Sequence, residues 1–338
     1  MLTFLLSLLG IALVLFTLLD VFKTVFVIGG GAGPQSSFIA DRTWRLALRL
    51  HVLGSQRSHS AMRSAGPLIV LLILLAWTAE LVLGWALLFP ASAFEEPASL
   101  TFADRVLFAT TAVIGRAGNA PALAIDGDGW ETLHSVAGLT GVFILSVGIA
   151  YVLPILSAVA HKRSIAAKIH TLGDGVADML ELGRTPGGSS FELHLVALVD
   201  QIVLTAERHR AYPVLHYFHS DNRHAALAPA IAKIALLLQE DLSDVDKVDR
   251  TVRVPLERAI ANLLGAISAM GLARYACDMP DLEDWNMATI ELDPAAAGGA
   301  HEGAVPRRWL EAYVRFDGWD WATVASRVYA GDIRVESA

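Results

Sequence analysis

The chain has little of what marks a secreted or a nucleic-acid-binding protein. Its 338 residues include one cysteine, Cys277, so an intrachain disulfide is excluded and a reducing compartment is favoured for the second half. Lysine and arginine number 26 against 34 aspartates and glutamates, and this balance argues against nucleic acid as a partner. Phosphate loops, dinucleotide fingerprints and nucleophile motifs are also missing from the sequence. We therefore expect neither an enzyme nor a bound cofactor.

Apolar residues are in excess, and they are unevenly distributed. They make up 54% of the chain, and the mean hydropathy of +0.49 is high for a soluble domain. The excess lies before residue 161. Three stretches there reach the ~20 residues needed to cross a bilayer: Leu2–Ile28, Pro67–Phe89 and Thr132–Ala160. The first lacks the basic start and cleavage pattern of a signal peptide, so we expect a retained span.

The charges between these stretches predict an orientation. The loop of residues 29–66 carries five arginines against the single Asp41, and the segment after the third stretch opens with His161, Lys162 and Arg163. The loop of residues 90–131 is instead acidic. Basic loops stay in the cytoplasm. We therefore expect the first loop and the C-terminal half to be cytoplasmic, with the N-terminus and the acidic loop outside.

The basic loop contains an amphipathic pattern. Ser37 is a candidate N-cap for a helix running to about Leu53. Its apolar face is formed by Ile39, Thr43, Leu46, Leu50 and Leu53, and its basic face by Arg42, Arg45 and Arg49. Such a helix suits either the lipid headgroup layer or packing on a soluble domain, and the pattern does not decide between the two.

The segment between the second and third stretches predicts a helix that enters the membrane and returns. Thr101 and Asp104 form a capping box, which begins a helix of about three turns over residues 102–112. That is too short to cross a membrane. Two glycines and Pro121 follow, so the next residues cannot continue as regular helix. Non-helical backbone at membrane depth must be buried in protein or line an aqueous cavity.

This arrangement resembles the pore module of the potassium channel family over residues 67–162. The family has a short pore helix ending in Thr-Thr, a Thr-Val-Gly-Tyr-Gly-Asp filter and a long inner helix. Matched from the front, five filter places start at Val113; matched from the back, Gly118-Asn119 replaces Gly-Asp. The resemblance implies a pore loop made of Thr110, Thr111, Ala112, Val113, Ile114, Gly115, Arg116, Ala117, Gly118 and Asn119.

Arg116 is the largest departure from the family pattern. The filter tyrosine is replaced by Arg116 or Ala117, and arginine side chains facing a narrow pore would repel cations. An arginine that points backwards instead needs a partner. Glu80 lies 13 residues into the second stretch, at about the depth expected for the returning loop. We predict a Glu80–Arg116 pair that supports the filter; the alternative is a Glu80 that faces other polar protein or snorkels outward.

Three residues of the third stretch are candidate gating hinges. Small residues let membrane helices approach closely, and proline bends a helix by removing a hydrogen bond. The resemblance implies gating by bending of the inner helix at Gly141, Gly148 or Pro154. Plain helix packing is the alternative, above all for Gly141.

The second half reads as an α-helical domain. Helices are expected over residues 165–182, from the capping box Ser189-x-x-Glu192 to His209, over 227–242 and 254–276, and over 306–329. Its tryptophans, Trp309, Trp319 and Trp321, are expected in the core. His216, His219, Asp221 and His224 are candidate metal ligands, but only the first two have firm spacing, so no metal is predicted.

The predicted fold is an all-α membrane protein with three transmembrane helices, a re-entrant pore helix and loop, and an α-helical cytoplasmic domain. The parts are residues 1–66, a pore module at 67–162 (outer helix 67–89, pore helix 102–112, filter-like loop 113–121, inner helix 132–160) and 163–338.

The resemblance implies a homotetramer that conducts ions, potassium by the family pattern, and that the cytoplasmic domain gates. The residues LLDVFKTV after Thr17 also resemble bacterial multi-span channel-like proteins, which implies the bacterial cytoplasmic membrane and its lipid bilayer. A non-conducting scaffold or sensor and an anion-passing pore are the alternatives, and Arg116 is the reason for both.

Overall fold

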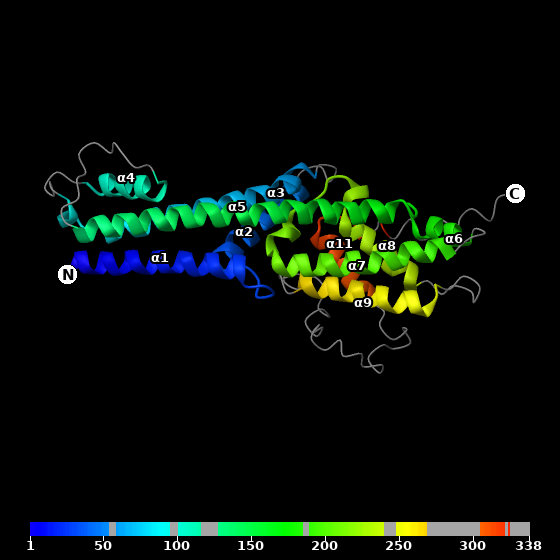
Figure 1. Ribbon diagram of the computed structural model, residues 1–338. Coiled ribbons are helices and arrows are strands. Elements are labelled where there is room, and N and C mark those ends of the chain that lie inside the picture. The colour runs from blue at the N-terminus through cyan, green and yellow to red at the C-terminus, as the bar shows by residue number, and fades with distance from the viewer. Residues whose placement is uncertain are drawn as a thin grey trace. The chain divides into compact units, whose positions relative to one another are not determined.

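The computed structural model describes residues 1–53, 59–94, 101–115, 128–184, 189–239, 248–268, 305–321 and 324. These residues form helices joined by turns, as Figure 1 shows, so the described part of the chain is all-α. The chain divides into two compact units. The first comprises residues 1–42 and 67–155, and the second comprises residues 43–66 and 156–338.

The long apolar helices lie largely in the first unit, and α3 and α5 each extend into the second. Helix α1 is Leu2–Phe26, α3 is Ser60–Leu88 and α5 is Asp128–His170. All three are long and apolar enough to cross a membrane, which confirms the three expected spans by length and composition. The shorter α4, Phe102–Val113, lies between α3 and α5 in the chain.

Small residues bring α1, α3 and α5 together. A Cβ placed on Gly10 of α1 would lie 2.5 Å from the carbonyl oxygen of Gly84 in α3. A Cβ on Gly148 of α5 would lie 2.9 Å from the side chain of Leu74 in α3. Without a hydrophobic effect between helices in lipid, such close approaches supply the packing energy.

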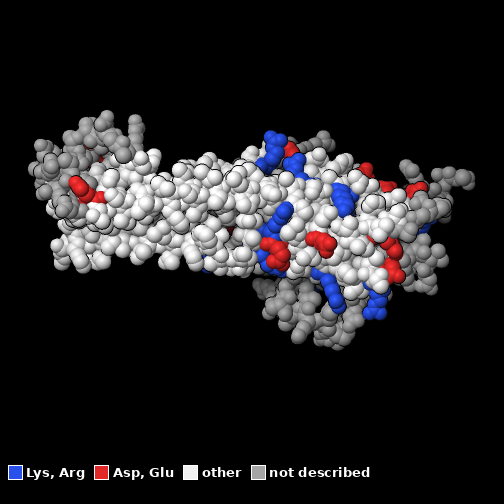
Figure 2. All heavy atoms as spheres, in the orientation of Figure 1, with Lys and Arg blue, Asp and Glu red and all other residues white. Residues whose placement is uncertain are grey.

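Figure 2 shows that the two units differ in how many charged side chains lie on the visible surface. The visible surface of the apolar helices is almost free of charged side chains, whereas lysines, arginines and acidic residues gather on the second unit. Large apolar side chains cover α1 on its exposed side, among them Leu5, Leu8, Leu15 and Leu19. An exposed apolar surface of this extent suits lipid and not water.

Helix α2, Pro34–Leu53, begins before the residue that the sequence suggested. Ser37 is not an N-cap: it lies inside the helix and its hydroxyl donates to the carbonyl of Pro34. Proline at the first helical position needs no N–H partner. The free N–H groups of the first turn are satisfied by Asp20 of α1, a tertiary contact that no local pattern reveals.

The second unit adds helices around a buried centre. They are α6 (Val176–Arg184), α7 (Ser189–Ala211), α8 (Leu227–Gln239), α9 (Arg250–Ile267) and α11 (Arg307–Phe316), with the 3-10 helices η3 (Pro213–Tyr217) and η4 (Arg223–Ala225). Helix α8 is buried from Leu227 to Leu238 and forms the core. Trp309 and Trp321 are buried, as expected.

The sequence predicted one helix over residues 165–182, but a turn interrupts that range in the structure. Helix α5 continues to His170, and the chain turns through Gly173 before α6 begins. A Cβ on Gly173 would lie 2.9 Å from the backbone nitrogen of Met179, so the turn fits closely against the start of α6. This turn carries a residue of the cluster described below.

Candidate functional site

Helix α4 begins as the sequence predicts. The Thr101 hydroxyl accepts a hydrogen bond from the Asp104 backbone N–H at 3.3 Å, and the Asp104 carboxylate accepts one from the Thr101 N–H at 2.8 Å. This reciprocal capping box confirms the start of the helix. Buried residues on one face, Phe108 and Val113 among them, hold α4 in the first unit.

Aromatic rings hold α4 in place near its middle. Phe108 packs edge-on against Phe89 and Phe94, with ring centroids 5.2 Å and 5.1 Å away. The His134 ring of α5 lies 4.9 Å from the same phenylalanine. One face of α4 is therefore anchored to the unit through Phe108, while Phe102 and Leu107 of the same helix are exposed.

The C-terminal end of α4 lies directly on α5. A Cβ on Gly141 would lie 1.8 Å from the carbonyl oxygen of Val113, so no other residue fits there without moving the backbone. The turn that follows contains Gly115 with a φ of 73°, in the left-handed region where glycine is favoured. Gly141 thus has a packing role against α4, in line with the alternative to a hinge.

The remaining predicted pore residues divide into two groups. The hydroxyls of Thr110 and Thr111 donate to the carbonyls of Val106 and Phe108 in their own helix. Ala112 is buried and Ile114 is exposed at the end of α4. Arg116, Ala117, Gly118 and Asn119 lie outside the described residues, so their arrangement stays a prediction.

Glu80 has partners other than the one predicted. Its carboxylate accepts a hydrogen bond from the Thr17 hydroxyl of α1 at 2.9 Å and another from the Gln35 side chain of α2. It therefore joins three helices on the side of α3 that faces α1. The Glu80–Arg116 pair remains a prediction, since Arg116 is not described.

Asp20 is the second acidic residue within an apolar helix, and its role went unrecognised in the sequence. Its carboxylate is buried and accepts hydrogen bonds from the Ser36 hydroxyl at 2.5 Å, the Gln35 N–H at 2.9 Å and the Trp77 indole N–H at 2.9 Å. The carboxylate lies at the N-terminal turn of α2, where the helix dipole stabilises a negative charge. The available signal was the presence of an aspartate inside an apolar stretch.

The hinge candidates of α5 have different surroundings. Gly148 packs against Leu74, as described above. Pro154 lies inside α5, and the helix continues beyond it to His170 without a break. Proline removes one backbone hydrogen bond there, so Pro154 stays a candidate for bending.

In the second unit, the predicted histidine group is dispersed. His216 stacks on Phe316 with ring centroids 4.0 Å apart, and His219 lies 3.0 Å from His59, from Nε2 to Nδ1. Asp221 pairs with Arg63 at 2.9 Å. His224 instead lies beside His170 and Asp174, two residues that the sequence did not single out.

The buried histidines share their surroundings with a lysine. Burial lowers the pKa of His209 and of His219 to about 3, and the pKa of His216 also lies well below 6.5. The Lys162 ammonium adds to these shifts; it donates to the Phe218 carbonyl at 3.1 Å. Burial raises the pKa of Asp317 to about 6, against the opposite effect of Lys162 3.9 Å away.

Comparisons with known proteins support the membrane assignment. No family model and no solved structure matches this chain. The chain is similar to an uncharacterized membrane protein, YdjJ, of Bacillus subtilis strain 168, with 27% identity over 231 residues, or 66% of this chain. The match spans 65% of that relative's length. Together with the three long apolar helices, this likeness identifies the chain as a multi-pass membrane protein.

Proposed function

We propose that this membrane protein is a potassium-channel-like protein that conducts ions passively through a pore formed by four copies of the chain. The observation that carries the proposal is the position of α4: a short, capped helix between two membrane-spanning helices, with its last carbonyl against Gly141 of the second. This is the arrangement of a pore helix that backs onto an inner helix.

The length of α4 supports a re-entrant path. At ~1.5 Å per residue its 12 residues extend ~18 Å, against ~30 Å of hydrocarbon. In the path that we propose, the helix enters the membrane and the chain returns on the same side. Its C-terminal end carries the negative end of the helix dipole, which favours a cation nearby.

The proposal includes the location and the gate. The basic loop of residues 29–66 and the second unit lie in the cytoplasm of a bacterial cell, with the N-terminus outside. Helix α5 runs unbroken from Asp128 to His170, so bending near Pro154 would link the pore to residues of the second unit. Lipid and three further copies of the chain are the partners.

Arg116 favours a second candidate function. A positive side chain in the filter-like loop opposes cation passage, so a non-conducting scaffold or sensor could keep the same helices. If Arg116 faces the axis, the loop would instead pass anions. Whether the Arg116 side chain faces the pore axis therefore distinguishes the three functions.

Ion flux in liposomes tests the proposal. Purified full-length protein is reconstituted, and potassium, sodium and chloride gradients are applied separately. Potassium-selective flux is the expected result, and chloride flux would establish the anion pore. Absence of any flux from folded tetramers, both in the wild type and in Pro154→Ala, which alters the bend of α5, would establish the non-conducting function.

A matched pair of glycine variants tests whether α4 lines the path. Gly141→Ala places a methyl group on the Val113 carbonyl, and flux should be lost because α4 must move. Gly129→Ala in the same helix meets nothing within 4 Å and serves as the control. Equal flux in both variants would contradict a role of α4 in conduction.

A further inference from the structure

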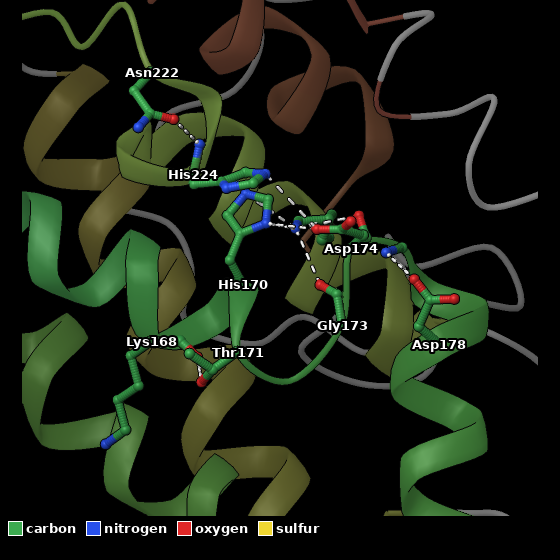
Figure 3. Close-up of polar contacts among 10 residues, drawn as sticks. Lys168, His170, Thr171, Gly173, Asp174, Asp178, Asn222 and His224 are labelled. Atoms are coloured by element: carbon green, nitrogen blue, oxygen red, sulfur yellow. Dashed lines mark hydrogen bonds and ion pairs between the residues drawn. The ribbon is translucent and has the colours of Figure 1, made fainter.

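Three side chains that can bind a metal converge at the end of α5. His170 is the last residue of that helix, Asp174 lies in the turn before α6, and His224 belongs to η4. His224 lies 54 residues after His170 and 50 after Asp174, yet Figure 3 shows the three side chains pointing toward one another. All three belong to the second unit.

The separations of their ligand atoms match a small coordination sphere. His170 Nδ1 lies 3.4 Å and His224 Nε2 3.8 Å from the same oxygen of Asp174, Oδ1. One ligand atom of each residue lies within 4.8 Å of the other two. A tetrahedral zinc ion with ligand bonds of ~2.1 Å needs ligand atoms about 3.4 Å apart. Small side-chain movements would therefore complete the geometry.

The backbone around these residues is held by hydrogen bonds of its own. The Asn222 side chain caps η4 by accepting from the His224 N–H at 2.9 Å. In the turn, Asp178 accepts from the Gly175 N–H at 2.9 Å. These bonds fix the backbone that carries His224 and adjoins Asp174, so less freedom is lost when their side chains bind an ion.

Lys233 opposes a cation at this position. Its buried ammonium lies 3.2 Å from His170 Nδ1 and 3.4 Å from the carbonyl oxygens of Gly173 and Asp174. The two carbonyl contacts help to fix the turn that carries Asp174. The positive charge repels a metal ion, so we expect binding weaker than in a structural zinc site, and reversible.

We propose that His170, Asp174 and His224 form a binding site for a divalent transition-metal ion, best matched by zinc. Two imidazoles and one carboxylate are ligands that zinc prefers, whereas calcium and magnesium prefer oxygen. Three protein ligands leave a fourth position for water. The ion would join the end of α5 to η4, and this role is independent of whether the protein conducts ions.

Zinc titration of the full-length protein tests the site. Protein purified in detergent and freed of metal by a chelator is titrated with zinc alone against a fluorescent zinc indicator. We expect a site that His224→Ala weakens by about 100-fold or more, since removing a supporting group alone costs 10–100-fold. The His224 side chain is 63% exposed, so this variant should fold normally, which metal-free melting curves check.

A second histidine variant supplies the matched control. His194 is exposed on α7, outside the cluster, and His194→Ala should bind zinc like the wild type. Cobalt offers an independent readout, because visible absorption bands report tetrahedral coordination, and His224→Ala should change them. Unchanged zinc affinity and cobalt spectrum in folded His224→Ala would overturn the proposal.

Discussion

Buried ionisable side chains have different surroundings in the two units. In the first unit, Asp20 accepts hydrogen bonds from two helices, and all of its donors come from α2 and α3. In the second, Lys162 and Asp317 are buried 3.9 Å apart, and the Nε2 atom of His216 has no hydrogen-bond partner among the described residues. A helix in lipid has no water as an alternative partner, so its carboxylate must be satisfied within the protein.

The stability of the two units should therefore depend on different groups. Removal of Asp20 should leave several hydrogen-bond donors without an acceptor. In the second unit, the free energy of unfolding should depend on pH, because ionisable groups are buried there without enough partners. The following changes test this difference, beginning with the largest expected effect.

Asp20→Ala should be the most damaging single change in the first unit. It leaves the Ser36 hydroxyl, the Gln35 N–H and the Trp77 indole without their acceptor, at a total cost of about 3–5 kcal/mol. Thermal melting in detergent measures the loss. Asp178→Ala in the second unit removes a single acceptor, for Gly175, and should cost only about 1 kcal/mol. Similar losses for both variants would remove the contrast between the units.

Acid should destabilise the second unit. His209 and His219 have folded pKa values of about 3 against 6.5 when unfolded, so the unfolded state binds more protons below pH 6.5. Their contribution is complete above that pH and is lost as pH falls toward 3. Asp317, with its pKa raised to about 6, acts in the opposite direction between pH 6 and its ordinary value of 3.8.

The net loss should be about 2–3 kcal/mol per pH unit just below pH 6, because three buried histidines, including His216, outweigh one carboxyl. Melting temperatures between pH 7.5 and 5 measure it. His216→Phe keeps a ring against Phe316 and should reduce the slope by about 1.4 kcal/mol per pH unit. The exposed His194→Gln should leave the slope unchanged; a flat profile in the wild type would contradict the account.

Gly141→Ala should destabilise the first unit by about 1–3 kcal/mol through overpacking. The added methyl group would lie 1.8 Å from the Val113 carbonyl, and the backbone must shift. Hydrogen exchange of the α4 amides localises the effect. Faster exchange in α1 and α3 but not in α4 would show that the contact is less tight than the structure indicates.

Thr101→Ala should have the smallest effect, about 1 kcal/mol, because it removes one cap at an exposed helix start. Exchange should rise in the first turn of α4 only. Thr171→Ala in the second unit, where the hydroxyl bonds to the Lys168 carbonyl at 2.7 Å, is a suitable control with no effect on α4.

Local sequence patterns predicted the structure correctly where it depends on residues close together in the chain. The apolar stretches predicted all three long helices, and the Thr101–Asp104 spacing predicted the start of α4. Helix ends were less accurate: α3 begins at Ser60, ahead of Pro67, and α5 extends to His170. A helix end depends on what satisfies its last backbone groups, and those partners often lie far away in sequence.

Spacing in the sequence did not predict which histidine and aspartate side chains lie together. His216, His219, Asp221 and His224 are close in sequence, yet each has a different partner in space. The cluster that forms uses His170, 54 positions before His224. Spacing predicts neighbours only within a regular helix. His216 lies in the 3-10 helix η3 and His224 in η4, while His219 and Asp221 lie in the non-helical residues between them.

By itself, then, the sequence determined the three membrane helices, the short capped helix between the last two, and the all-α class, because hydrophobic length and capping act within a few residues. Only the tertiary structure decided that Asp20 caps α2, that Glu80 meets Thr17 and Gln35, and that His170, Asp174 and His224 converge. Those contacts join segments that meet only after the helices pack, and no local pattern carries that information.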